Sequence, residues 1–226
     1  MCDSKEHTLQ LAYGLAREKL SGMDIKQQCF RSGVQYIHPE KMIIEYLNQS
    51  YVVAIPSMEI VLMDRLRHCE GRNPVTTVEG QESCENINLK DKILILHYLI
   101  TAKGTPTTGK LIGFRQVPGG IFEHASFSRE VLTPLLEHFG KEPERLVEAA
   151  ANLGGSKVAY GDVAVSIKAF PNVPVVIVLW RGDDEFAPNA SMLFDSTVAD
   201  YLSTEDMSVL CARIVEILTL SGQKEG

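Results

Sequence analysis

The chain has 226 residues, of which 45% are hydrophobic and 23% are charged, and its formal net charge is -7. These values exclude a disordered chain and allow one large domain or two small ones. The acidic balance also argues against DNA or RNA as a partner, because nucleic-acid-binding proteins usually carry a basic patch.

The sequence indicates neither a membrane span nor export. The longest apolar run, from Ile93 to Ala102, is much shorter than the roughly 20 residues that a spanning helix needs. The N-terminus carries acidic residues where a signal peptide would have a basic start. We therefore expect a cytoplasmic protein with no membrane partner. The cysteines include no CxxC pair and indicate neither a disulfide framework nor a metal site: Cys2, Cys29, Cys69, Cys84 and Cys211.

The first third of the chain predicts one helix followed by strands. Apolar residues at helical spacing predict an amphipathic helix over residues 5–20. Residues 42–63 contain β-rich runs broken by Asn48 and Pro56, which is typical of short antiparallel strands. Residues 68–88 are polar, lack apolar periodicity and predict a long loop.

The rest of the chain predicts several helices and a hairpin. Asn88 is suited to cap an apolar helix that ends before Gly104, and Pro134 bends or restarts a later helix. The apolar run from Val173 to Trp180 predicts a central strand that forms a hairpin with the run before it. The predicted helices cover residues 89–103, 126–140, 142–155 and 203–220, and the hairpin covers residues 160–180.

These elements predict an α+β fold, with a mainly antiparallel sheet covered by several helices. We expect one integrated domain over residues 1–226. If the chain is subdivided, residues 1–70 form an N-terminal subdomain, residues 68–88 a loop and residues 89–226 the larger portion.

The stretch GTPTTGKL, from Gly104 to Leu111, nearly matches a phosphate-binding P-loop. Leu111 replaces the Ser or Thr whose hydroxyl would hold magnesium, and Pro106 removes a backbone N–H. A P-loop joins a strand to a helix, whereas here a predicted helix precedes the motif and a strand-like run, Leu111 to Gly120, follows it. We therefore predict a turn that does not bind nucleotide.

The stretch RGDDEF, from Arg181 to Phe186, resembles the GGDEF signature of diguanylate cyclases. Asp183 stands where the second glycine should be, and the βαββ arrangement of a cyclase has no counterpart around it. The alternative is an acidic turn that closes a buried strand, and we prefer it.

The histidines show no HExxH or other metal-ligand spacing. His97 lies in an apolar helix, so we expect a hydrogen-bonded core residue. His124 differs, because it follows a glycine-rich segment and precedes a helix. Trp180, the only tryptophan, ends the predicted central strand, where core packing or the wall of a pocket would each explain it.

Three blocks of the sequence, Leu96 to Gly120, Leu153 to Asp195 and Tyr201 to Leu210, together resemble an uncharacterised domain family of anaerobic bacteria and archaea. Some members look like fusions to a four-cysteine iron–sulfur domain that also occurs in a corrinoid protein of one-carbon metabolism. This chain lacks those four cysteines. The resemblance implies an anaerobic context and an association with corrinoids. It implies no catalytic residues, and the DxHxxG signature of the familiar corrinoid fold is absent.

The function that we expect is non-enzymatic binding of an organic cofactor, with a corrinoid or another tetrapyrrole as the preferred ligand. An iron–sulfur or methyl-transfer protein is the expected partner. One alternative is an enzyme in which His124, Asp183, Asp184 and Asp195 meet in one cleft. Another is a protein-interaction module without a small ligand.

The expected site combines two segments, Val117 to His124 and Trp180 to Phe186, in one concave pocket. A glycine-rich bend allows a ligand to approach the backbone, aromatic side chains provide apolar walls, and a neutral imidazole can coordinate a metal. His124 is the predicted metal ligand. The predicted cofactor-binding residues are Gly119, Gly120, Phe122, His124, Trp180, Asp183 and Asp184.

Overall fold

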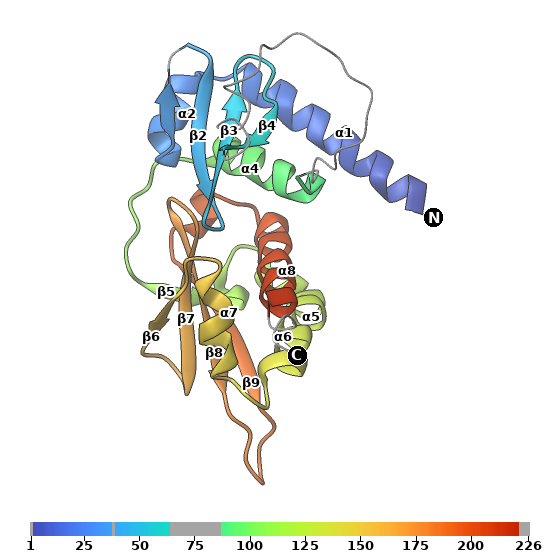
Figure 1. Ribbon diagram of the computed structural model, residues 1–226, viewed down its shortest axis with the longest axis vertical. Helices are drawn as coiled ribbons and strands as arrows, with labels where there is room; N and C mark the ends of the chain where they lie inside the picture. Colours follow the sequence, from blue (N-terminus) through green and yellow to red (C-terminus); the bar gives the residue numbers. More distant parts are fainter. Residues whose placement is uncertain (1, 38, 64–86, 222–226) are drawn as a thin grey trace, which may run out of the picture.

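The computed structural model of the protein describes residues 2–37, 39–63 and 87–221. Figure 1 shows two halves stacked along the long axis, each with one sheet and its own helices. Both sheets in the described residues are antiparallel. The α+β prediction is confirmed, with two sheets where the sequence analysis expected one.

The described residues of the N-terminal half form a four-stranded sheet and the helices α1, α2 and α4. The sheet order is β1-β2-β3-β4, and α4 packs against α1 beside it (Figure 1). The helix over residues 5–20 and the strands within residues 42–63 are therefore confirmed, while the predicted loop over residues 68–88 lies almost entirely outside the described residues. The elements are α1 (Cys2–Ser21), α2 (Ile25–Ser32), β1 (Gln35–Ile37), β2 (Lys41–Tyr46), β3 (Gln49–Ala54), β4 (Ile60–Leu62) and α4 (Leu89–Thr101).

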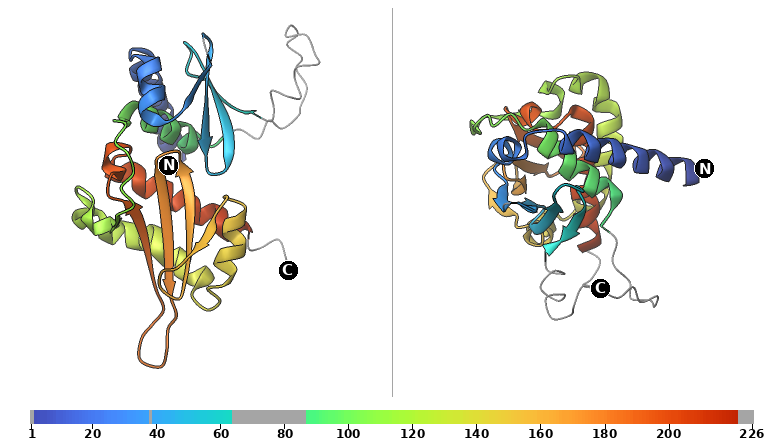
Figure 2. Two further views of the ribbon diagram at one scale, coloured as in Figure 1. Left: turned by 90° about the vertical axis from the view of Figure 1, so that its left-hand side faces the viewer. Right: turned by 90° about the horizontal axis from the view of Figure 1, so that it is seen from above.

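The C-terminal half contains a five-stranded sheet in the order β5-β9-β8-β7-β6. The two views in Figures 1 and 2 place α8 along one face of this sheet. The elements are β5 (Leu111–Gly113), α5 (Gly120–Phe127), α6 (Thr133–Phe139), α7 (Arg145–Ala151), β6 (Ser156–Val158), β7 (Val163–Phe170), β8 (Val173–Trp180), β9 (Asn189–Asp195) and α8 (Thr204–Ser221).

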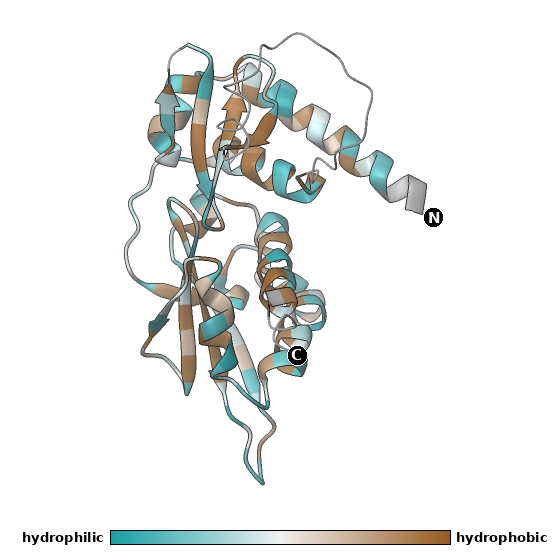
Figure 3. Ribbon diagram, viewed as in Figure 1, coloured by the Kyte–Doolittle hydropathy of each residue, from teal (hydrophilic) through white to brown (hydrophobic). Residues whose placement is uncertain are grey.

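Strand β8 is central, as its continuously apolar sequence predicts. Ile177 on β8 is opposite Val165 on β7 and Met192 on β9, and all three side chains are buried. Figure 3 shows the apolar residues of β7 and β8 in brown. The helix-covered face of this sheet contributes to the main core, so its register is determined by which side chains must be buried.

Aromatic side chains join the two halves. The ring of Tyr98 on α4 stacks on Phe170 at the end of β7, with centroids 4.3 Å apart and planes 6° apart. The Tyr98 hydroxyl accepts a hydrogen bond, at 3.3 Å, from the backbone N–H of Asn172 in the turn between β7 and β8. A backbone hydrogen bond from Leu47 N–H to the Ala169 carbonyl also crosses the junction. Buried residues of both halves therefore form one continuous hydrophobic core.

Among the described residues, no helix has the combination of length and apolar character that a membrane span requires.

Candidate functional site

The near-match to a P-loop is a turn, as predicted. It follows helix α4 and leads into the short strand β5, so the strand-to-helix context of a P-loop is absent. The backbone N–H groups of Thr108 and Gly109 donate to the carboxylate of Asp195, at 3.0 and 2.7 Å. Two amides that a phosphate would need are thus already bound to a carboxylate of the protein.

Asp195 has a structural role in this turn. The side chain is buried and also accepts hydrogen bonds from the backbone and the hydroxyl of Thr197. Burial raises the pKa of Asp195, but the hydrogen bonds from Thr197, Thr108 and Gly109 together lower it below its ordinary value. The ionised carboxylate therefore holds the turn in place.

The glycine-rich segment from Val117 to His124 starts a helix. Its first part is not the strand that the sequence analysis expected, because the strand ends at Gly113 and a 3-10 turn, Phe114–Gln116, follows. Gly119 has a φ of +78°, and a Cβ on Gly120 would lie 1.9 Å from the Phe114 carbonyl oxygen. The backbone can fold back at this point only because both residues are glycines. Their presence in the sequence is therefore explained without a bound ligand.

His124 lies on α5 beside a positive charge. Its Nδ1 is 3.3 Å from a guanidinium nitrogen of Arg115, which is a donor, so Nδ1 is the acceptor and the proton of the neutral ring is on Nε2. Partial burial and then Arg115 lower the pKa of His124. The lone pair that could bind a metal is therefore directed at Arg115 and is not available to a ligand in this arrangement.

The segment from Trp180 to Phe186 closes the β8–β9 hairpin as an acidic turn. Asp183 accepts hydrogen bonds from the backbone N–H groups of Glu185 and Phe186, at 2.9 and 2.7 Å, and these bonds lower its pKa. Trp180 pairs with Asn189 across the hairpin. The segment is therefore the acidic turn at the end of a buried strand that we preferred to a GGDEF signature.

Two pockets lie near the predicted segments, and neither is lined by both segments. The turn lines a shallow pocket of about 490 Å³. The other lining residues are Gly140, Lys141, Ala187 and Pro188, so none belongs to the Val117–His124 segment. From that segment only Glu123 reaches the other pocket, and it meets no residue of the turn there. Asp195 lines neither pocket. The cause is topological, because the turn is the tip of the long β8–β9 hairpin (Figure 1), whereas the residues before α5 bond to the start of α8 through Pro118 and Thr204.

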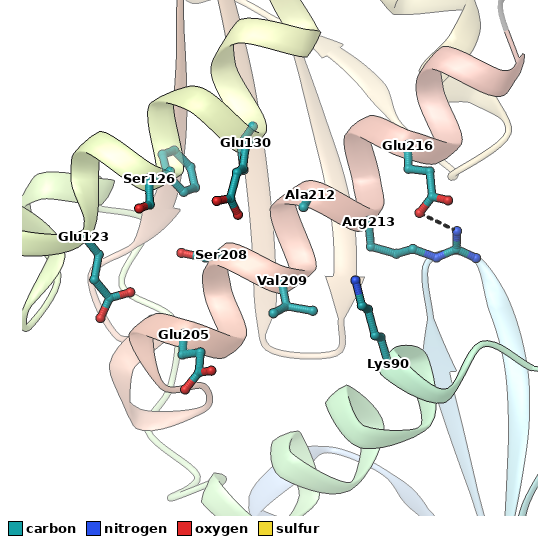
Figure 4. A pocket seen from close by; sticks show the side chains of 12 residues that line it. Lys90, Glu123, Ser126, Glu130, Glu205, Ser208, Val209, Ala212, Arg213 and Glu216 are labelled. Atoms are coloured by element: carbon teal, nitrogen blue, oxygen red, sulfur yellow. Dashed lines mark hydrogen bonds and ion pairs between the residues drawn. The ribbon is translucent and has the colours of Figure 1, made fainter. Parts of the chain in front are cut away.

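A second pocket lies between the start of α4, the segment from α5 to residue 131, and α8 (Figure 4). Its volume is about 510 Å³, within the range of roughly 300–1,000 Å³ typical of small-molecule sites. The lining residues are Lys90, Glu123, Ser126, Phe127, Glu130, Val131, Glu205, Ser208, Val209, Ala212, Arg213 and Glu216. We call this the three-helix pocket.

One wall of the three-helix pocket is a π-helical turn, Ser128–Leu132, which provides Glu130 and Val131. Pro134 explains the wide turn, because proline has no N–H to donate to the carbonyl four residues earlier and its ring clashes with that carbonyl. The predicted restart at Pro134 is confirmed, since α6 begins at Thr133. π-helical turns are frequent at functional sites.

The polar groups of the three-helix pocket are unevenly distributed. Figure 4 shows Glu123, Glu130 and Glu205 with the hydroxyls of two serines at one end, and Lys90 with the Arg213–Glu216 ion pair at the other. Apolar side chains, including Val209 and Ala212, lie between them. The pocket therefore offers hydrogen-bond acceptors at one end, the Lys90 ammonium beside an ion-paired arginine at the other, and an apolar surface in the middle.

Arg213 connects this pocket to the junction of the two halves. Its guanidinium binds the buried carboxylate of Asp91 on α4, with three N–O distances of 3.1 Å, and also binds Glu216 at 3.0 Å. The hydroxyl of Tyr46 on β2 donates a second bond to Asp91, at 2.9 Å. Burial raises the pKa of Asp91 although Arg213 and Tyr46 oppose the shift. The network fixes α4 relative to α8.

His97 makes the second polar link between α4 and α8. Its Nδ1 lies 2.7 Å from the carboxylate of Asp206, which also accepts a hydrogen bond from the Ser203 hydroxyl. The bond to Asp206 raises the pKa of His97, partly offset by burial. The expectation of a hydrogen-bonded residue is confirmed, although the imidazole is half-buried at the junction and not enclosed in the core.

The described lining of the three-helix pocket contains no histidine and no cysteine. Within residues 2–37, 39–63 and 87–221, no three His, Cys, Asp or Glu side chains are grouped closely enough to hold a metal ion. The arrangement is suited to hydrogen bonding and charge pairing with an organic molecule.

Sequence analysis missed these lining residues because they look like an ordinary solvated helix face. On α8 they recur every three or four residues: Glu205, Ser208, Val209, Ala212, Arg213 and Glu216. Small residues in the middle of this face were the available signal, because they leave room between neighbouring helices.

A comparison with protein-family models places residues 24–217 in DUF3786, a domain of unknown function. The match covers most of the chain, so the protein belongs to this family. No curated protein and no solved structure is significantly similar to it.

Proposed function

We propose that this member of the DUF3786 family is a non-enzymatic binding protein that holds an organic ligand in the three-helix pocket. The observation that carries the proposal is the pocket itself, a cavity of about 510 Å³ with an apolar middle and hydrogen-bonding groups at both ends. Such a combination is characteristic of small-molecule sites, where apolar walls provide affinity and a few polar groups fix orientation.

The distribution of charge defines the ligand that fits. Glu123, Glu130 and Glu205 are acceptors when ionised, so the ligand end beside them must carry N–H or O–H donors. Lys90 favours an anionic group at the opposite end. The ligand is therefore bipolar, with donors at one end and an acid or phosphate group at the other.

A corrinoid meets this description and is the specific ligand that we propose. Its ring edge carries amide groups, which donate hydrogen bonds, and complete corrinoids also carry a phosphodiester. A whole corrin ring is larger than the pocket, so one edge would enter. Tetrapyrroles whose side chains are carboxylates fit less well, because those carboxylates would meet the glutamates.

The proposed setting is the cytoplasm of an anaerobe, with an iron–sulfur or methyl-transfer protein as the partner that supplies or receives the ligand. The support for this setting is the family resemblance. The enzyme alternative has less support, because His124 and Asp195 line neither of the two pockets described and Asp183 and Asp184 line only the pocket at the hairpin tip.

Isothermal titration calorimetry of the full chain with aquocobalamin tests the proposal, with haem as the carboxylate-bearing comparison. We expect aquocobalamin to bind more tightly than haem. Ala212→Trp fills the three-helix pocket, and Ala187→Trp is its matched control in the hairpin-tip pocket. The first variant should weaken binding at least about tenfold, while the second leaves it unchanged.

Glu130→Gln provides a second variant that keeps the shape of the side chain, in case the larger substitution perturbs folding. It should weaken aquocobalamin binding, because an amide is a poorer acceptor than a carboxylate. Absence of binding to the wild-type protein, or binding that none of the pocket variants alters, would contradict the proposal.

A further inference from the structure

Two large apolar side chains at the start of α5 are almost fully exposed. Ile121 is 72% exposed and Phe122 is 91% exposed. The packing of α5 does not need them, because Phe127 stacks on Phe114 with centroids 3.9 Å apart, and Gly120 packs on the same 3-10 turn. Exposing both side chains therefore contributes nothing to the fold and costs the free energy of hydrating them.

Two glutamates adjoin this apolar pair. Glu123 follows it directly on α5, and Glu205 lies in the first turn of α8. The start of α8 is held against the start of α5 by a hydrogen bond from the Thr204 hydroxyl to the Pro118 carbonyl. Both glutamates are exposed, and among the described residues neither forms an ion pair with a lysine or arginine.

Basic side chains from the same part of the chain have partners of their own. Arg129 pairs with Glu130 at 3.0 Å, and the Arg115 guanidinium, which keeps its charge, is directed at the neutral His124 ring and is not within ion-pair distance of the two adjoining glutamates. The surface around Ile121 and Phe122 thus combines apolar side chains with negative charge that the described residues leave unpaired. We call Ile121, Phe122, Glu123 and Glu205 the α5 patch.

We propose that the α5 patch docks an amphipathic helix of a partner protein, one that carries lysines or arginines beside large apolar residues. Ile121 and Phe122 would contact the apolar stripe of that helix, and Glu123 and Glu205 would pair with its basic residues. This is an interaction that goes beyond the binding of a ligand in the three-helix pocket.

Charge excludes the other occupants that an apolar patch could have. A second copy of the chain in a two-fold symmetric dimer would place the same patch on both sides of the interface and bring the glutamates together. An anionic membrane surface would repel the same two carboxylates. A basic helix is the occupant whose charge complements the patch.

The position of the α5 patch connects docking with the proposed ligand. Glu123 and Glu205 also line the acidic end of the three-helix pocket (Figure 4). A partner helix on the patch would therefore lie at the edge of that pocket, where it could cover a bound ligand. The apolar part of the patch lies outside the pocket lining, so docking can be tested without any ligand.

The test is fluorescence anisotropy of the full chain with a labelled synthetic helix of about 18 residues, built from leucine and lysine, at physiological salt. The same helix built from leucine and glutamate is the negative control. Ile121→Ser combined with Phe122→Ser should weaken binding of the basic helix by about tenfold or more, as expected for an apolar anchor. Phe30→Ser is the matched control, because Phe30 on α2 is 88% exposed and is not part of the α5 patch.

Charge is tested separately. Glu123→Gln combined with Glu205→Gln should weaken binding about fivefold, whereas Asp184→Asn combined with Glu185→Gln at the hairpin tip should leave it within about twofold. Equal losses in the control variants would show attraction to the net charge alone and overturn the proposal. The proposal is also overturned if the basic helix does not bind. Displacement of the helix by anionic vesicles would assign the α5 patch to a membrane surface. A dimer in sedimentation that the Ile121 and Phe122 substitutions dissociate would assign the patch to a second copy of the chain.

Discussion

Replacing Arg213 by methionine tests the polar network that joins the two halves of the protein. Methionine keeps most of the apolar stem of the side chain and removes the guanidinium that binds Asp91 and Glu216. Asp91 is only 4% exposed, so its carboxylate would keep the Tyr46 hydroxyl as its one remaining partner from this network. An uncompensated buried charge is the main cost of such a substitution.

Removing one partner of a buried ion pair typically costs about 3 to 5 kcal/mol, and the remaining Tyr46 bond favours the lower end of that range. We therefore expect Arg213→Met to lower the free energy of unfolding by about 3 kcal/mol at neutral pH. Glu216 is exposed, so its pair with Arg213 accounts for at most about 1 kcal/mol of the loss. Glu216→Gln measures that share directly.

The assay is urea-induced unfolding followed by circular dichroism and by the fluorescence of Trp180. Adding Asp91→Asn to Arg213→Met should recover part of the loss, because no buried charge then remains. Lower pH should also reduce the loss, because without Arg213 the folded-state pKa of Asp91 rises and the folded protein takes up a proton more readily than the unfolded chain. A loss below about 1 kcal/mol that is unaffected by Asp91→Asn would refute the reasoning.

Three further predictions concern the core, the junction and the start of α5. Ile177→Ala should cost about 2 to 5 kcal/mol in reversible denaturation, because the side chain is fully buried on the central strand. His97 should titrate above its ordinary pKa in NMR, so the stabilisation from its bond to Asp206 is complete below about pH 6.5 and is lost as pH rises through the folded-state pKa. Gly120→Ala should lower the melting temperature by several degrees, because its Cβ would collide with the Phe114 carbonyl oxygen.

Each of these predictions has a matched control. Val61→Ala on the partly exposed edge strand β4 should cost less than Ile177→Ala, and comparable losses would contradict the burial argument. His97→Gln should remove the pH dependence assigned to the imidazole, and its persistence would assign that dependence to another group. For Gly109→Ala, the added Cβ would point into open space, and only the positive φ of +73° would cause strain. Its loss of stability should therefore be smaller than that of Gly120→Ala.

Sequence patterns predicted the long elements because each carries its own signal. The β7–β8 hairpin has two apolar runs separated by a turn, and the central position of β8 follows from its continuous apolar character. Helix α2 was missed because it is short and mostly polar, although Asp24 and Gly33 cap it in the expected way. Strand β9 was missed although Ala190, Met192 and Phe194 alternate toward the core.

The candidate site could not be predicted to the same extent, because it depends on contacts between distant parts of the chain. Asp91 and Arg213 are 122 residues apart in sequence, and nothing local to either residue indicates the other. Gly119 and Gly120 were predicted to form a bend that a ligand approaches, whereas the neighbour that requires Gly120 is the Phe114 carbonyl of the chain itself. Local patterns identify such constraints without showing whether a ligand or the backbone satisfies them.

Amide hydrogen exchange of the full chain, with and without aquocobalamin, tests the central claim most directly. A ligand in the three-helix pocket should slow exchange in residues 120–132 and 204–216, because these segments provide its walls. The same measurement should show no change in residues 181–188 at the hairpin tip. Protection confined to residues 181–188, or no protection at a ligand concentration that saturates binding, would contradict the account.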